Sequence, residues 1–145
     1  MENIKNFLFG ISLGIILLAS LGLNIVLHES GHFTAAKIAD LNPKMHFFEP
    51  YGGGKVSSFT PNFFVTYGGK GSLAKDFGIA FAGPLVNLII TLFLLTVYFV
   101  IPKEKRTLRL NLVFAMLIVP SLMSFVANML PIGFSDGSLI LNYLK

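Results

Sequence analysis

Two histidines and a glutamate stand together in the stretch LHESGHF, residues 27–33. His28 and His32 are four positions apart, so on a helix both imidazoles lie on one face and can reach one metal ion. Glu29 lies between them, where its carboxylate can take a proton from water beside that ion. This H-E-x-x-H spacing indicates metal-assisted hydrolysis. The alternative is an ordinary helix end whose histidines extend towards lipid headgroups.

The elements that must position these residues are long apolar segments. Hydrophobic residues make up 54% of the 145-residue chain and charged residues 12%, which is about half the charged share of an ordinary soluble domain. The runs 7–27, 77–101 and 110–130 contain no charged residue, and each exceeds the roughly 20 apolar residues that a helix needs to cross a bilayer core. We therefore predict an all-α polytopic membrane protein with three transmembrane helices, organised as a single domain over residues 1–145.

The segments between the runs predict further elements. The first helix is expected to continue beyond its span to about Leu41, where Asn42-Pro43 stops it. Short β-favouring pieces surround the glycine cluster 52–54, which predicts a short β-hairpin-like loop between the first two helices. The stretch 138–145 is apolar enough to form a short final helix.

A third metal ligand is required, because catalytic zinc usually has three protein ligands and one open position. The chain has no cysteine, so this ligand must be an imidazole or a carboxylate. The candidates that follow the histidines on the same side of the predicted membrane are His46, Glu49, Asp76 and Asp136. The predicted topology does not choose among these four, although Asp76 and Asp136 each lie next to an apolar run.

Three separate motifs resemble those of the site-2 protease family of intramembrane zinc metalloproteases, reduced here to a minimal three-span core. HESGH at 28–32 matches the family's H-E-x-x-H helix, and AGPLVN at 82–87 is similar to its Gly-Pro-x-x-Asn segment. NMLPIGFSDG at 128–137 matches the N-x-x-P-x-x-x-x-D-G motif. The chain departs from the pattern at Phe134-Ser135, where the family commonly has leucine before Asp-Gly; we expect this to change packing and not ligation.

The resemblance implies an intramembrane zinc metalloprotease that hydrolyses peptide bonds of transmembrane or membrane-anchored proteins. It implies that Zn²⁺ is held by His28, His32 and Asp136, that Glu29 is the catalytic residue and that Asn87 binds the substrate. The alternative function is a catalytically inactive membrane protein that binds helices or metal without cleavage. The intact set of ligand residues favours the protease.

The expected partners are the lipid bilayer and a membrane-protein substrate. Nucleic acid is not expected, because no basic cluster is interleaved with aromatic residues in a soluble segment. Five basic residues fall on one predicted side of the membrane and six on the other, so the positive-inside rule does not orient the chain. The resemblance implies a multi-pass protein of the cell membrane with its active site facing the cytoplasm. Gly10 and Gly14 form a G-x-x-x-G pattern that leaves the oligomeric state open.

Overall fold

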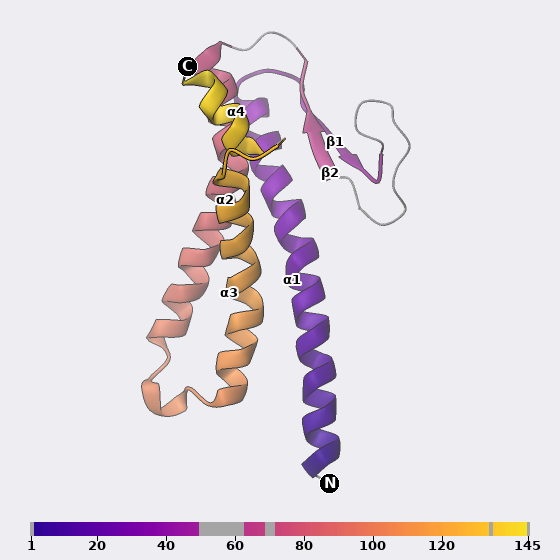
Figure 1. The fold of residues 1–145 in the computed structure, drawn as a ribbon, viewed down its shortest axis with the longest axis vertical. Helices are drawn as coiled ribbons and strands as arrows, with labels where there is room; N and C mark the ends of the chain where they lie inside the picture. The colour runs from indigo at the N-terminus through magenta and orange to yellow at the C-terminus, as the bar shows by residue number, and fades with distance from the viewer. Residues whose placement is uncertain (1, 50–62, 69–71, 134, 145) are drawn as a thin grey trace.

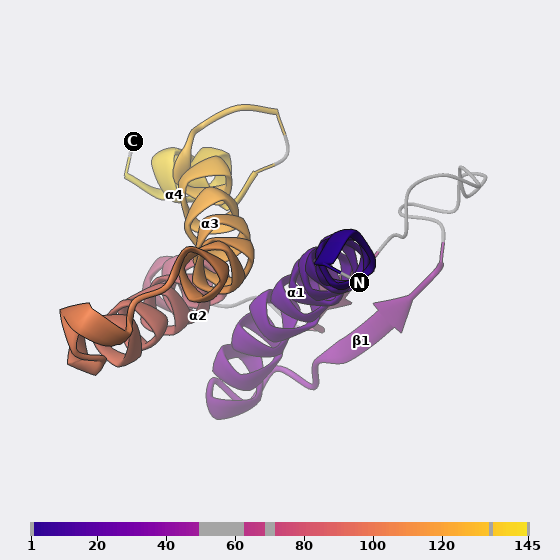
Figure 2. The same ribbon diagram turned by 90° about the horizontal axis from the view of Figure 1, so that it is seen from below.

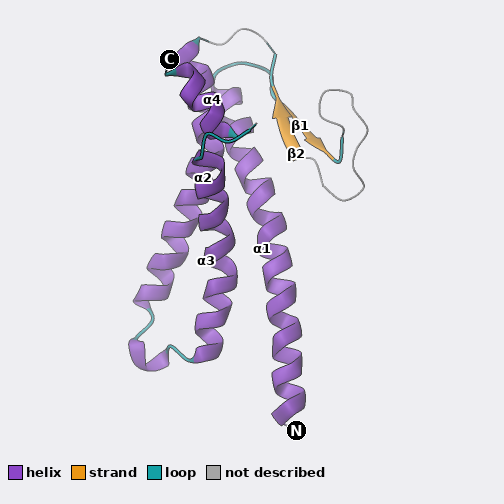
Figure 3. Cartoon of the chain, in the orientation of Figure 1, coloured by secondary structure: helices purple, strands orange, loops and turns teal. Residues whose placement is uncertain are grey.

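The computed structural model describes residues 2–49, 63–68, 72–133 and 135–144. Its main elements are the helices α1 (Glu2–Ile38), α2 (Leu73–Val100) and α3 (Leu108–Met129), all long and apolar enough to cross a membrane. The strands β1 (Lys44–Phe47) and β2 (Phe63–Thr66) lie between α1 and α2, and a short helix, α4 (Asp136–Tyr143), follows α3 (Figure 1, Figure 3). The predicted fold class, three candidate membrane helices with a hairpin between the first two, is confirmed.

α1 ends at Ile38, three residues before the predicted end at Leu41. The chain leaves the helix through Asp40, whose φ of 66° is left-handed, a conformation that Asp tolerates better than most residues. The N–H of Leu41 then donates to the carbonyl of Ala36 at 3.0 Å, and the two side chains pack in one small apolar cluster. This bond and contact are those of a Schellman motif, so α1 stops before Pro43 is reached.

The other two long helices begin earlier than their apolar runs predict, because polar caps start them. The side-chain oxygen of Ser72 accepts a hydrogen bond from the N–H of Lys75 at the start of α2. Thr107 accepts in the same way from the N–H of Leu110 at the start of α3. Such caps satisfy backbone donors that have no partner within the helix. α2 then continues through Pro84 to Val100.

β1 and β2 pair antiparallel, with Lys44 opposite Thr66 and Phe47 opposite Phe63. The hairpin predicted between the first two helices is therefore present. The glycine cluster 52–54, which contributed to that prediction, lies outside the described residues. The hairpin stands beside the C-terminal half of α1 (Figure 1).

The three long helices pack closely at one end only. The buried residues of α1 start at Ser20, those of α2 end at Thr91, and those of α3 start at Pro120. Towards its N-terminus α1 diverges from the pair formed by α2 and α3, as two perpendicular views show (Figure 1, Figure 2). The closely packed end is also where the hairpin and α4 lie, so the interior of the protein is confined to this end.

Candidate metal centre

α1 presents a stripe of polar side chains to the interior. Residues four apart share one helix face, and the buried polar residues of α1 follow this spacing: Ser20, Asn24, His28 and His32. The Nε2 atoms of His28 and His32 lie 3.1 Å apart. The i, i+4 spacing therefore brings the two imidazoles together at one point inside the helix bundle, as the sequence predicts.

Asp136, the first residue of α4, lies against both imidazoles. One carboxylate oxygen is 3.0 Å from Nε2 of His28 and the other is 3.4 Å from Nε2 of His32. Burial disfavours the charged carboxylate, but hydrogen bonds from the two imidazoles outweigh that effect, so the pKa of Asp136 lies below its ordinary value. The carboxylate is therefore ionised, as a metal ligand must be.

Two neighbours of Asp136 hold it in this place. The side-chain oxygen of Ser135 accepts from the N–H of Ser138 at the start of α4 and donates to the carbonyl of Leu130 at the end of α3. Gly137 allows the two helices to approach, because a Cβ there would lie 2.8 Å from the carbonyl carbon of Leu130. Ser135 therefore caps α4, a role that the sequence analysis did not predict. A serine directly before Asp-Gly and an apolar run is the available signal for such a cap.

The spacing of the three groups is comparable to the spacing between ligands of one metal ion. Zinc binds imidazole nitrogen and carboxylate oxygen at about 2.0–2.1 Å, which separates neighbouring tetrahedral ligand atoms by about 3.3 Å. The two Nε2 atoms are 3.1 Å apart, and they lie 3.0 and 3.4 Å from two different oxygens of Asp136. Gly83 on α2 closes the other side, where a Cβ would overlap His32 and lie 2.8 Å from Cε1 of His28.

Glu29 belongs to the same group. Ligand atoms of His28, Glu29 and His32 all lie within 4.8 Å of one another, so these three residues form a group that could hold a metal ion. The Glu29 carboxylate also lies beside the backbone of Val65 on β2. The hairpin therefore lies against α1 beside the paired imidazoles.

The far nitrogen of each imidazole has a partner on α2. Nδ1 of His32 lies 2.7 Å from the carbonyl oxygen of Ile79. Nδ1 of His28 lies 3.1 Å from the amide nitrogen of Asn87, which is in turn 2.6 Å from the hydroxyl of Ser124 on α3. The sequence analysis did not predict Ile79 or Ser124 as partners of this site. The contact of Ile79 is made by its backbone carbonyl, which residue type does not reveal. Ser124 could have been found, because it lies four positions before Asn128 of the third motif and so on the same helix face.

The remaining predicted candidates lie elsewhere. On β1, Nδ1 of His46 lies 2.6 Å from Glu49 and Nε2 lies 2.8 Å from the hydroxyl of Thr66. Asp76 lies in the first turn of α2, where an acidic residue interacts favourably with the helix dipole. Of the four candidates for a third ligand, Asp136 is the one that the described structure places against both imidazoles.

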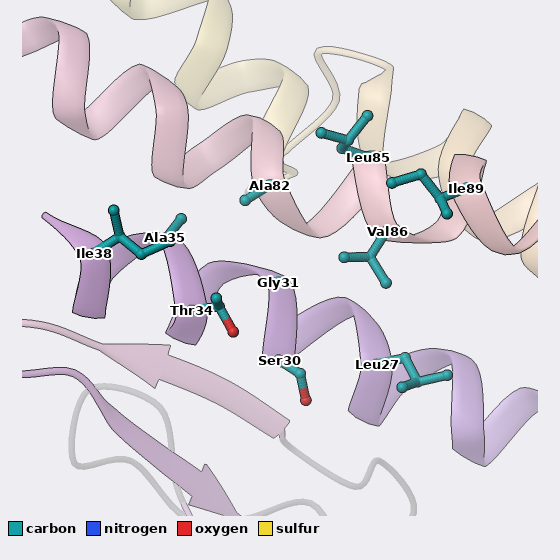
Figure 4. Close-up of a pocket in the computed structure, with 10 residues that line it drawn as sticks. All are labelled: Leu27, Ser30, Gly31, Thr34, Ala35, Ile38, Ala82, Leu85, Val86 and Ile89. Carbon is teal, nitrogen blue, oxygen red and sulfur yellow. The ribbon is translucent and has the colours of Figure 1, made fainter.

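A separate apolar groove of about 450 Å³ runs between α1 and α2 (Figure 4). Side chains such as Leu27, Leu85 and Ile89 line it, and none of the predicted site residues does. The helices touch along it, since a Cβ on Gly31 would lie 2.6 Å from the carbonyl oxygen of Ala82. The groove is therefore distinct from the candidate metal centre.

Comparison with family models, curated proteins and solved structures gives no match to this chain. The likeness to site-2 proteases therefore rests on the three short motifs. The structure adds three helices that are long and apolar enough to span a membrane and a His-Glu-His group that could hold a metal ion.

Proposed function

We propose that this protein is an intramembrane zinc metalloprotease that cleaves transmembrane or membrane-anchored proteins. One observation carries the proposal. The two imidazole nitrogens on α1 lie 3.1 Å apart, and each lies 3.0–3.4 Å from one oxygen of the carboxylate at the start of α4, close to the separation of about 3.3 Å between ligands of tetrahedral zinc. An ordinary helix end has no reason to bring a distant carboxylate onto two buried imidazoles.

In this proposal His28, His32 and Asp136 hold the zinc. The bound ion supplies a Lewis acid that polarises the scissile carbonyl and lowers the pKa of water towards neutrality. Glu29, one residue from a ligand, takes a proton from the attacking water and donates it to the leaving amine. The backbone of Val65 lies beside Glu29, so this general base stands next to the hairpin.

The position of the group along α1 explains how water-dependent chemistry coexists with lipid. His28 follows Phe7, the first residue of the apolar run, by 21 positions, or about 32 Å of helix. A bilayer core is about 30 Å thick. The proposed site thus lies near one membrane face, within reach of water. A substrate helix must unwind there, because its peptide groups are otherwise hydrogen-bonded to one another.

Two further proposals come from the resemblance alone. The protein resides in the cell membrane, with the site facing the cytoplasm. The predicted contact between Asn87 and the substrate stays a prediction, and the Asn87 side chain is fully buried.

The test is to purify wild type and Glu29→Gln in detergent, to measure bound zinc by elemental analysis and to assay cleavage of a membrane-spanning peptide. Glu29→Gln should retain zinc and lose about 10²–10⁴-fold in cleavage rate, the usual contribution of a general base. His28→Ala should lose both zinc and cleavage. Equal cleavage by Glu29→Gln and wild type would refute the mechanism. Zinc binding without cleavage of any membrane substrate would favour the alternative, a catalytically inactive membrane protein.

A further inference from the structure

Asn87 occupies the centre of the contact between the three long helices. Its side chain is 0% exposed. Its amide nitrogen lies 3.1 Å from Nδ1 of His28 on α1 and 2.6 Å from the hydroxyl of Ser124 on α3. Its amide oxygen is buried and has no hydrogen-bond partner among the described residues. Which of the two amide atoms faces His28 therefore depends on the hydrogen bond that this imidazole needs.

His32 shows which kind of hydrogen-bond partner a metal-binding imidazole needs at its Nδ1. A neutral imidazole has one N–H and one nitrogen lone pair. Nδ1 of His32 lies 2.7 Å from the carbonyl oxygen of Ile79, and a carbonyl can only accept. In the neutral imidazole that binds a metal, Nδ1 of His32 therefore carries the proton, which leaves the lone pair of Nε2 for the ion. Metal-binding histidines commonly donate their second N–H to such an oxygen.

The same argument for His28 requires that the amide oxygen and nitrogen of Asn87 exchange places. If His28 binds zinc through Nε2, its Nδ1 carries a proton and needs an acceptor. The amide nitrogen of Asn87 is itself a donor and cannot serve, whereas the amide oxygen can. A half-turn of the amide exchanges two groups of nearly equal size, so the packing is preserved. After this turn the oxygen accepts from both His28 and Ser124, and the nitrogen becomes the group without a partner.

We infer that Asn87 is a positioning residue, whose side-chain oxygen accepts a hydrogen bond from Nδ1–H of His28 and so aims Nε2 of that imidazole at the metal. This inference rests on the proposed function, because it requires zinc at Nε2. It differs from the substrate contact that the family resemblance implies. Asn87 acts on the metal through His28, and Ser124 donates to the same oxygen, which ties α1, α2 and α3 together at the metal centre.

Zinc affinity in detergent, measured by competition with a chelator, tests the inference with three variants. Asn87→Asp retains an acceptor oxygen and should bind zinc about as tightly as wild type. Asn87→Leu keeps the size of the side chain without an acceptor and should bind about 10–100-fold more weakly, the usual effect of an outer partner of a zinc ligand. Thr96→Val is the control on the same helix: it removes an exposed hydrogen bond to the backbone oxygen of Leu92, away from the metal centre, and should leave zinc affinity unchanged.

Nitrogen NMR of the imidazoles provides a readout that packing alone does not move. In zinc-loaded wild type and Asn87→Asp, Nδ1 of His28 should carry a proton held in a hydrogen bond. The inference is wrong if Asn87→Leu binds zinc as tightly as wild type, or if Asn87→Asp loses as much affinity as Asn87→Leu. Failure of the wild type to bind zinc would instead refute the proposed function. Zinc affinity that is unchanged in both Asn87 variants, with cleavage lost, would favour the substrate contact.

Discussion

The two ends of the helix bundle are built differently. The closely packed end carries His28, His32 and Asp136 and is called the metal end. There, hydrogen bonds between buried polar groups join the helices: Asn87 links α2 to His28 and Ser124, and Ser121 donates to the backbone of Asn87. At the other end the joining contacts are more exposed. Arg109 at the start of α3 donates to the side chain of Asn6 and lies 5.1 Å from the ring of Phe9.

This contrast shows where the chain places costly groups. Among the described residues, the buried polar side chains of α1 begin at Ser20, those of α2 end at Thr91, and that of α3 is Ser121. Large apolar side chains are exposed at both ends, for example Ile15 and Phe93 towards the other end and Ile38 at the metal end. In lipid, apolar burial does not drive helices together, so packing and polar contacts must do so. The metal end should therefore govern metal binding, and the other end should contribute only stability.

The largest expected effect is that of Asp136→Asn. This change removes the charge that lies 3.0 and 3.4 Å from the two imidazoles, and a neutral amide is a poor zinc ligand. Changes in residues that hydrogen-bond to a metal ligand typically weaken metal binding by about 10–100-fold. Asp136→Asn should weaken zinc binding by more than this. Competition titration with a chelator measures this effect.

Asp76→Asn is the matched control for that change. Asp76 also lies next to a membrane run, but in the first turn of α2, and the sequence alone leaves it open as a ligand. Its variant should bind zinc like wild type. Loss of zinc in Asp76→Asn, with full binding in Asp136→Asn, would move the third ligand from α4 to the first turn of α2.

An intermediate effect is expected for Gly83→Ala. The added methyl group would overlap His32 and lie 2.8 Å from Cε1 of His28, and such overpacking typically costs about 1–3 kcal/mol. Displaced imidazoles should bind zinc about 10–100-fold more weakly, a factor of ten for each 1.4 kcal/mol. Gly78→Ala on the same helix meets no atom within 4 Å and should leave zinc affinity unchanged. Equal zinc affinity in the two variants would show that Gly83 does not shape the centre.

The sequence predicts the helices and the paired histidines well because both depend on local rules. Apolar length indicates a span, and the i, i+4 spacing places His28 and His32 on one face. The return of Asp136 to α1 depends on contacts that are distant in the chain, so spacing alone left four candidates open. The acceptor for His32 is the backbone carbonyl of Ile79. Every residue has such a carbonyl, so this contact cannot be predicted from residue type.

The smallest effect is expected at the other end, for Arg109→Ala. The change removes a hydrogen bond of 2.8 Å to Asn6 and the contact with the Phe9 ring, and exposed cation–π contacts contribute about 0.5–1 kcal/mol. Thermal unfolding in detergent should show a slightly lower midpoint, while zinc affinity stays at the wild-type value. Lys103→Ala, an exposed change in the same turn, should alter neither. Weaker zinc binding in Arg109→Ala would mean that the two ends are coupled, because α1 could then hold His28 and His32 in register only when its N-terminal half is fastened to α3.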